Sequence, residues 1–244
     1  MRHAILGDIH ANLAALEAVL REVDAEGIEE IIQVGDVVGY GAAPKEVIEI
    51  LREREIVVVK GNHDAACVGE LDARLFNRDA RAGVRFTESK LERDELQWLQ
   101  RLPLVAETEH CSVAHGTLHR PERFEYVQSI ADAEPSLDMM EHPVCFVGHT
   151  HVPVTIMRLL EDPHRTSYTI ERSVDLSESS VALCNIGSVG QPRDEDPRAA
   201  YAIYDSDTKQ LELFRIDYDT EREADRITRA GLPKILADRL FLGF

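Results

Sequence analysis

Five short apolar runs along the chain each end on side chains of the kinds that bind metal ions. The central run, residues 57–59, leads through Lys60 into Gly61-Asn62-His63-Asp64. The other four are residues 4–6 before Asp8 and His10, 31–34 before Asp36, 112–114 before His115, and 144–147 before His149 and His151. Runs of this kind predict buried strands. Because ligands gather beyond the carboxyl ends of strands in α/β sheets, we expect these five ends to form one site.

The first 60 residues predict two βαβ units. Apolar residues from 13 to 23 fall on one helix face, and Asn12 is placed to cap that helix. Pro44 suits the first turn of a second helix that runs through Leu51. Strand, helix, strand, helix, strand in this order indicates a parallel sheet with right-handed crossovers.

The middle of the chain predicts helices with one hairpin between them. Residues 70–85 indicate a helical excursion, and residues 87–100 a clearer helix that ends before Pro103. Residues of about 65–100 are therefore expected to form a helical cap over the site. Residues 104–107 and 111–115 are typical of a hairpin, and residues 128–141 of another helix.

After residue 151 the pattern changes to strands without intervening helices. The expected strands are residues 154–160, 167–172, 181–186, 200–204 and 211–216. This change predicts a second, mainly antiparallel sheet. Thr220 and Glu223 are spaced as a capping box for a C-terminal helix, and Pro233 is placed to start the last one. We expect one domain over residues 1–244.

Composition narrows the range of partners. The 244 residues are 44% apolar, and 27 Lys and Arg stand against 45 Asp and Glu, which gives a formal charge of −18. Without a basic run the chain is not expected to bind long nucleic acid, although metal ions could attract a small anion. Four scattered cysteines indicate reduced core thiols, and no apolar run approaches the roughly 20 residues that cross a bilayer. We therefore expect a cytoplasmic protein without membrane contact.

The motifs together resemble the signature of the calcineurin-like metallophosphoesterases. They are Asp8-Ile9-His10, Gly35-Asp36, Gly61-Asn62-His63-Asp64, His115 and Gly148-His149-Thr150-His151. Residues 35–41 and 185–193 resemble the small bacterial and archaeal branch of that family. Taken singly, Asp8 could be a strand-end cap, Asn62 a turn residue and His115 a core histidine, but five motifs in the family order favour a metal site. The resemblance implies a four-layer α/β/β/α sandwich of two mixed sheets flanked by helices.

The resemblance also implies two divalent metal ions. The ligand sets would be Asp8, His10, Asp36 and His151 for one ion and Asp36, Asn62, His115 and His149 for the other, with Asp36 as the bridge. Mixed nitrogen and oxygen ligands suit Mn, Fe, Ni, Co or Zn and do not select among them. Two such ions would clamp a phosphate and bring the pKa of a shared water towards about 7, so that a bridging hydroxide attacks the ester.

Further residues are assigned to catalysis and substrate binding. His63 resembles the family's general acid, which protonates the leaving oxygen or holds the phosphate, and Asp64 would orient His63. Asn62 would also contact substrate. Arg193 suits a bidentate phosphate contact, with surface ion pairing as the alternative. His119 would line the cleft, with an ordinary loop histidine as the alternative.

The expected activity is metal-dependent hydrolysis of a phosphate ester, with a small phosphodiester as the expected substrate. Monoesters, dinucleoside polyphosphates and phosphoprotein remain open, as does the oligomeric state. The alternative from another class is a metal-binding scaffold without catalysis, which the presence of His63 and all seven ligands disfavours. Where many family members have Gly-Asp-x-x-Asp, this chain has Gly39 at the last position, and this weakens the analogy with the large protein phosphatases.

Overall fold

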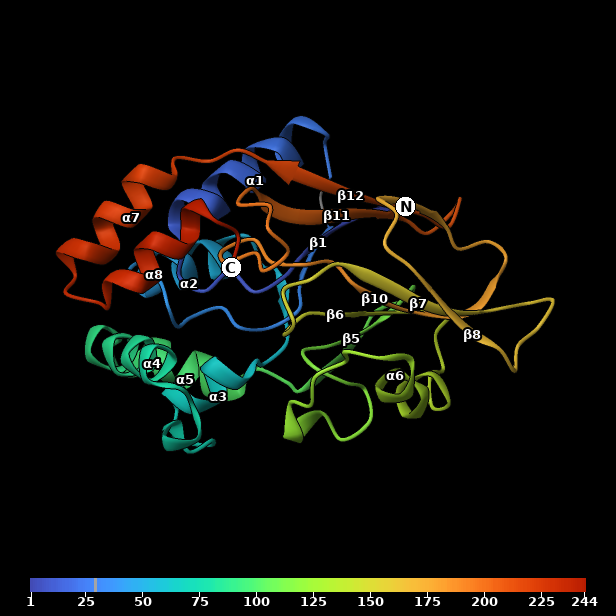
Figure 1. Ribbon diagram of the computed structural model, residues 1–244, viewed down its shortest axis with the longest axis horizontal. Helices are drawn as coiled ribbons and strands as arrows, with labels where there is room; N and C mark the ends of the chain where they lie inside the picture. Colours follow the sequence, from blue (N-terminus) through green and yellow to red (C-terminus); the bar gives the residue numbers. More distant parts are fainter. Residues whose placement is uncertain (29) are drawn as a thin grey trace.

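The computed structural model describes residues 1–28 and 30–244, and its strands there form two six-stranded sheets (Figure 1). Sheet A has the order β3 (Val57–Val58), β2 (Glu30–Gln33), β1 (Arg2–Leu6), β11 (Ala199–Asp205), β12 (Gln210–Ile216) and β9 (Ser173–Asp175). Sheet B has the order β4 (Val105–Glu107), β5 (Ser112–Ala114), β6 (Val144–Val147), β10 (Ser179–Asn185), β7 (Val154–Leu159) and β8 (Thr166–Thr169). Each sheet mixes parallel and antiparallel pairs: β1, β2 and β3 run parallel, as do β5, β6 and β10.

Helices cover the outer faces of the two sheets. They are α1 (Leu13–Ala25), α2 (Pro44–Glu53), α3 (Asn62–Cys67), α4 (Arg78–Lys90), α5 (Arg93–Arg101), α6 (Ile130–Leu137), α7 (Thr220–Arg229) and α8 (Lys234–Asp238), with 3₁₀ turns η1 (Ala73–Leu75), η2 (Pro121–Arg123) and η3 (Arg239–Phe241). In Figure 1, α1 lies above sheet A and α6 lies below sheet B. This is the four-layer arrangement that the sequence predicted.

The core between the sheets is built from the inward faces of strands in both. Ile5 and Ile32 of sheet A meet Val113, Phe146 and residues beside them in sheet B, and all of these side chains are fully buried. Burial of this apolar area, at about 25 cal/mol per Å², fixes the two sheets face to face. The strand ends that carry the polar motifs are thereby held at one common edge.

Helix starts follow the signals in the sequence, with two corrections. Asn12 caps α1 by accepting a hydrogen bond from the Ala15 amide (3.0 Å), as predicted. The helix expected over residues 87–100 is instead divided, because α4 ends at Lys90 and a new capping box joins the Glu92 amide to the Glu95 carboxylate (2.7 Å).

The C-terminal helix is also capped differently from the prediction. Asp219 is the N-cap of α7 and accepts from the Arg222 amide (2.9 Å). Glu223 does not close a capping box with Thr220; its carboxylate accepts from the Ala14 amide of α1 (3.3 Å). Glu223 therefore joins α7 to α1, a contact between distant segments that local spacing does not reveal.

The expected second sheet exists and is mainly antiparallel, but the strands after residue 151 are shared between the two sheets. The run 167–172 contains the end of β8, a crossing between the sheets, and the approach to β9, which pairs with β12. β11 pairs with β1, so β11 and β12 complete sheet A rather than forming a sheet of their own. Alternation of apolar and polar residues identifies a strand but not the sheet that it joins.

His3, a polar residue in the first strand, lies in the core. Its side chain is fully buried beside Tyr204 and His110, with the Glu30 carboxylate against the ring. Burial lowers the pKa of His3, while the Glu30 carboxylate works to raise it.

Among the described residues, no helix combines the length and the hydropathy needed to span a bilayer.

Candidate metal centre

The strand ends meet as the sequence predicted, and they bring all seven expected ligands together. Each of the seven side chains is at most 9% exposed. One group contains Asp8, His10, Asp36 and His151, and a second contains Asp36, His115 and His149; within each group the candidate ligand atoms lie within 4.8 Å of one another. The Oδ1 atom of Asn62 lies 3.1 Å from Nε2 of His115, which adds the amide to the second group. Asp36 belongs to both groups, the place expected of a bridge.

Backbone carbonyls fix the orientation of three imidazoles. Nδ1 of His10 donates to the Val38 carbonyl (3.0 Å), and Nδ1 of His115 donates to the Val34 carbonyl (2.9 Å). Nδ1 of His151 donates to the Gln191 carbonyl (2.6 Å). These bonds set the tautomer, so Nε2 of each ring, when the ring is neutral, is an acceptor that faces the cluster.

The acceptors converge in a way that calls for a cation. Nε2 of His10 and Nε2 of His151 lie only 3.1 Å apart, and both have their ring proton on the other nitrogen. Nε2 of His115 likewise faces the Asn62 oxygen (3.1 Å) and Nδ1 of His149 (3.1 Å). Lone pairs at these distances repel unless a proton or a metal ion lies between them. The donor set therefore fits divalent ions that accept mixed nitrogen and oxygen ligands.

The pKa values of the buried carboxylates and imidazoles also indicate a site for a cation. Burial raises the pKa of Asp8 to about 7. Burial also works to raise the pKa of Asp36, but the surrounding imidazoles, His115 first among them, hold it well below its usual range. His115 is the counterpart: burial works to lower its pKa, and the Asp36 and Asp8 carboxylates raise it to about 9. The site favours positive charge next to Asp36, which a metal ion would supply.

Five of the seven expected ligands lie in the left-handed backbone region. The φ angles are 40° at Asp8, 49° at His10, 55° at Asp36, 69° at His149 and 62° at His151. Asp and His adopt this region more readily than most side chains, yet a cluster of such residues is unusual. Strained backbone gathers at functional sites, where the surrounding fold imposes it.

Two glycines make room for imidazoles of the site. A Cβ atom on Gly35 would lie 2.6 Å from Nδ1 of His115, and one on Gly39 would lie 2.2 Å from Nδ1 of His63. Both glycines also have positive φ, 96° and 90°. At position 39 this chain departs from the wider family pattern, and the space that the His63 ring occupies explains why a glycine stands there.

His63 lies in the site, but Asp64 has another task than the expected one. The His63 ring packs against His10, Tyr40 and Phe76, and burial lowers the pKa of His63 to about 4. The Asp64 carboxylate accepts hydrogen bonds from the amides of Gly61 (2.9 Å), Val38 (3.1 Å) and Val37 (3.3 Å). Asp64 thus holds the loop after β2 against the start of α3, and the expectation that it orients the His63 ring is not supported by these contacts.

Arg193 lies beside the cluster and His119 does not. The Arg193 guanidinium donates to the Tyr40 hydroxyl (3.3 Å) and to Oε1 of Gln191 (3.4 Å), and its Nε is buried without a partner among the described residues. Its charge is the second cause, after burial, that lowers the pKa of His151. His119 is not among the residues that line the cleft beside the cluster, and its amide is bound to Ser136 (3.2 Å). The loop-histidine alternative therefore describes His119 better.

An open cleft of about 280 Å³ adjoins the cluster through Asn62, His63 and His149. Tyr40 and Phe76 line it, and so do Phe124 and Tyr126 from the segment after η2. Sequence reasoning missed Phe124 and Tyr126, because the loop between β5 and α6 has no periodic pattern that would indicate a wall. Their only signal is that they follow the His115 motif closely in the chain.

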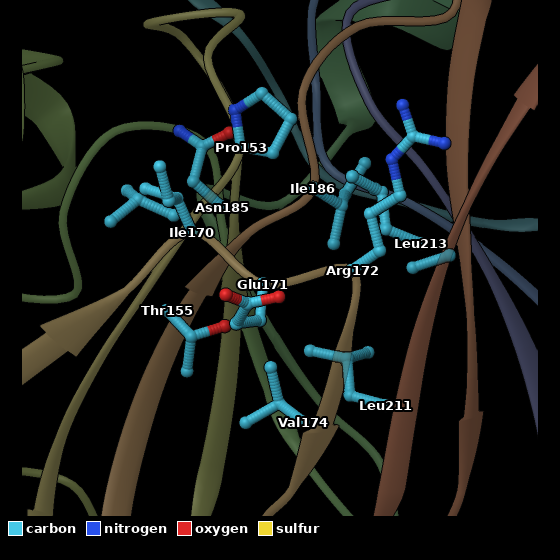
Figure 2. A pocket seen from close by; sticks show the side chains of 12 residues that line it. Pro153, Thr155, Ile170, Glu171, Arg172, Val174, Asn185, Ile186, Leu211 and Leu213 are labelled. Carbon is cyan, nitrogen blue, oxygen red and sulfur yellow. The ribbon is translucent and has the colours of Figure 1, made fainter.

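Asn185 at the end of β10 supports the loop that carries two ligands. Its Nδ2 donates to the Gly148 carbonyl (2.5 Å) and to the Thr150 hydroxyl (2.9 Å), and its Oδ1 accepts from the Gly187 amide (3.0 Å). Figure 2 shows Asn185 beside a small cavity where the chain crosses from β8 towards β9 through Glu171 and Arg172. With a volume of about 20 Å³ this cavity has room for about one water molecule, so it is not a substrate site.

Comparison with known proteins identifies the family. Residues 1–209 match the calcineurin-like phosphoesterase superfamily domain. The chain belongs to this superfamily. It is also 34% identical over 246 residues to the protein MJ0912 of Methanocaldococcus jannaschii, with 98% of this chain and 97% of that protein covered.

Solved structures agree with this assignment. A metallophosphoesterase from Sphaerobacter thermophilus is 36% identical and superposes with a TM-score of 0.86, with both chains covered completely. The protein PH1004 from Pyrococcus horikoshii OT3 is 22% identical, has a TM-score of 0.81 and covers 100% of this chain and 98% of its own; this likeness concerns the fold alone. The predicted family and the predicted two-sheet sandwich are thus confirmed, and this phosphoesterase is assigned to hydrolysis of phosphate esters.

Proposed function

We propose that this phosphoesterase hydrolyses a small phosphodiester and uses two divalent metal ions held by the seven residues of the cluster. The observation that carries the proposal is the convergence of buried acceptors on two adjoining points that share Asp36. Bound ions would supply Lewis acidity and activate a water molecule at neutral pH. The identity of the ions is left open among Mn, Fe, Ni, Co and Zn by the ligand set.

The chain's own residues would bind and orient the ester. Arg193 has a guanidinium without a carboxylate partner among the described residues, and it suits contact with a phosphate oxygen. Asn62 and His63 line the cleft where the ester would lie. His63, uncharged at neutral pH in the metal-free protein, can donate one N–H to the phosphate or to the leaving oxygen.

Charge alone does not select between a diester and a monoester. Arg193 lies beside the cluster, Arg123 lies at the cleft wall, and the Arg239 guanidinium lies 5.8 Å from the centre of the Tyr40 ring. These cations could meet the two negative charges of a monoester as well as the one charge of a diester. The diester is therefore proposed on the family resemblance, with monoesters, dinucleoside polyphosphates and phosphoproteins as the alternatives.

The test compares bis-p-nitrophenyl phosphate with p-nitrophenyl phosphate, with added Mn²⁺ and with an EDTA control. We expect metal-dependent release of nitrophenol and a higher kcat/KM for the diester. Failure on both substrates with metal bound would reject the enzyme in favour of the scaffold alternative, and a higher kcat/KM for the monoester would reject the diester assignment.

His63→Ala tests the catalytic assignment. The substitution should leave metal content unchanged and lower turnover by about 10² to 10⁴, the usual contribution of a group that transfers a proton or holds the transition state. His164→Ala, at an exposed histidine in the turn before β8, is the matched control and should retain turnover. If His63→Ala kept the turnover of the wild type, the general-acid role would belong to another residue.

A further inference from the structure

The walls of the cleft have an unusual composition for this chain. Arg123 is the one Asp, Glu, Lys or Arg among the described lining residues, although these four types make up 30% of the chain. One wall carries Leu71, Leu75 and Phe76, between α3 and α4. The other wall carries the aromatic pair after η2. A cleft walled in this way binds an apolar group beside the phosphate.

Two aromatic rings that line the cleft pack against imidazoles of the site. Tyr126 stacks on His149 with ring centroids 3.8 Å apart and planes 19° apart, and it remains 47% exposed. Phe76 meets His63 edge to face, at 4.9 Å and 85°. These contacts hold the rings in place before a ligand enters, which lowers the entropy lost on binding.

The backbone supplies an independent sign of function at this wall. Phe124 has φ 50° and Tyr40 has φ 53°. Bulky side chains rarely adopt the left-handed region, and they remain there only where the surrounding structure holds them. Both residues line the cleft. Two bulky residues with left-handed backbone thus lie at the surface that a ligand would touch.

We propose that this cleft is a binding subsite for a planar aromatic group of the phosphate ester, held between the wall of Phe76 and the wall of Tyr126. The inference rests on the proposed function and adds the class of substrate. A volume of about 280 Å³ is close to the lower end of small-molecule pockets, about 300 Å³. It suits one ring next to the phosphate. An aliphatic ester of the same charge has no π-face to stack.

The experiment measures binding of phenylphosphonate and methylphosphonate to the Mn²⁺-loaded protein by titration calorimetry. The two probes carry the same charged group and differ in the ring, so the ratio of their Kd values isolates the subsite. We expect phenylphosphonate to bind roughly tenfold more tightly. Tyr126→Leu and Phe76→Leu should each reduce that ratio at least about threefold, and Tyr126→Phe should preserve it because the ring remains.

Tyr168→Leu is the matched control, since Tyr168 lies on β8 and is 64% exposed. Metal content and thermal unfolding show whether each variant is folded and carries Mn²⁺. If Tyr126→Leu loses the metal, the ratio of Kd values in Phe76→Leu alone tests the subsite. Equal Kd values for the two probes in the wild type would overturn the subsite, as would a ratio that survives in the folded leucine variants. Turnover of bis-p-nitrophenyl phosphate separates the two proposals: turnover without ring preference rejects the subsite, and ring preference without turnover rejects the proposed function.

Discussion

Asn185 offers a direct test of how the fold positions the metal centre. Asn185→Ala removes two hydrogen bonds to the loop 148–150 and leaves the Gly187 amide without its side-chain acceptor. The Gly148 carbonyl keeps its hydrogen bond from the Thr150 amide (2.8 Å), so it loses one hydrogen bond and retains another. Two lost bonds at about 0.5–1.5 kcal/mol each and one unsatisfied amide at about 1–3 kcal/mol give an expected loss of about 2–6 kcal/mol in the free energy of unfolding.

The same substitution should weaken metal binding, because the loop carries His149 and ends at His151. Loss of groups that orient metal ligands typically lowers affinity by about 10- to 100-fold. The assay is calorimetric titration of the metal-free protein with Mn²⁺, beside urea unfolding of the same samples.

Ser136→Ala is the matched control for Asn185→Ala. Ser136 is fully buried and accepts from the amides of Leu118 (3.1 Å) and His119 (3.2 Å), so its removal also deprives buried donors but touches no expected ligand. We expect a similar loss of stability and an unchanged Kd for Mn²⁺. If both variants lost stability while the Asn185 variant bound Mn²⁺ within twofold of the wild type, the positioning role would be refuted.

Three further predictions follow from the structure. Removal of divalent ions with EDTA should lower the Tm, and free Mn²⁺ at 100 times its Kd should add about 2.7 kcal/mol to the free energy of unfolding, whereas a Tm indifferent to metal would contradict the site. Gly39→Ala should reduce turnover while metal remains bound, because the new Cβ would meet the His63 ring at 2.2 Å from Nδ1 and the φ of 90° is unfavourable for alanine; full turnover would contradict the packing. Burial lowers the pKa of His3, so below about pH 6.5 the unfolded chain binds a proton at this residue that the folded chain does not bind, and the free energy of unfolding falls as the pH falls. His3→Phe should reduce this loss of stability between pH 7 and pH 5 in urea unfolding. An equal loss in the variant and the wild type would contradict the prediction.

The ends of strands were the most predictable part of the molecule. A buried strand leaves a dense apolar run, and the first polar residues after it, such as Asp8 and Asp36, stand out in the sequence for that reason. The parallel pairing of β1, β2 and β3 then places these residues at one edge without any knowledge of side-chain contacts. Much of the candidate metal centre was therefore accessible from pattern alone.

Contacts between distant segments were not accessible in this way. The sheet to which β9 and β11 belong depends on partners that are far along the chain. His3 reads as a polar residue at the start of a strand, yet Tyr204 and the Glu30 carboxylate cover it. Tyr126 lies in an irregular loop, and only the fold brings its ring onto His149.

The metal centre is the place where local preference and the fold disagree most. Its expected ligands combine left-handed backbone, which disfavours L-residues by roughly 1–2 kcal/mol each, with acceptor atoms about 3.1 Å apart. Asp and His tolerate this backbone better than most residues, so the residue types that can bind metal are also those that fit the conformation. Tyr40 and Phe124 share the backbone conformation without that tolerance, so the surrounding fold holds them in it. A cation would relieve the repulsion between acceptors only in the folded state, so its binding should be coupled to folding more strongly than ligand number alone implies.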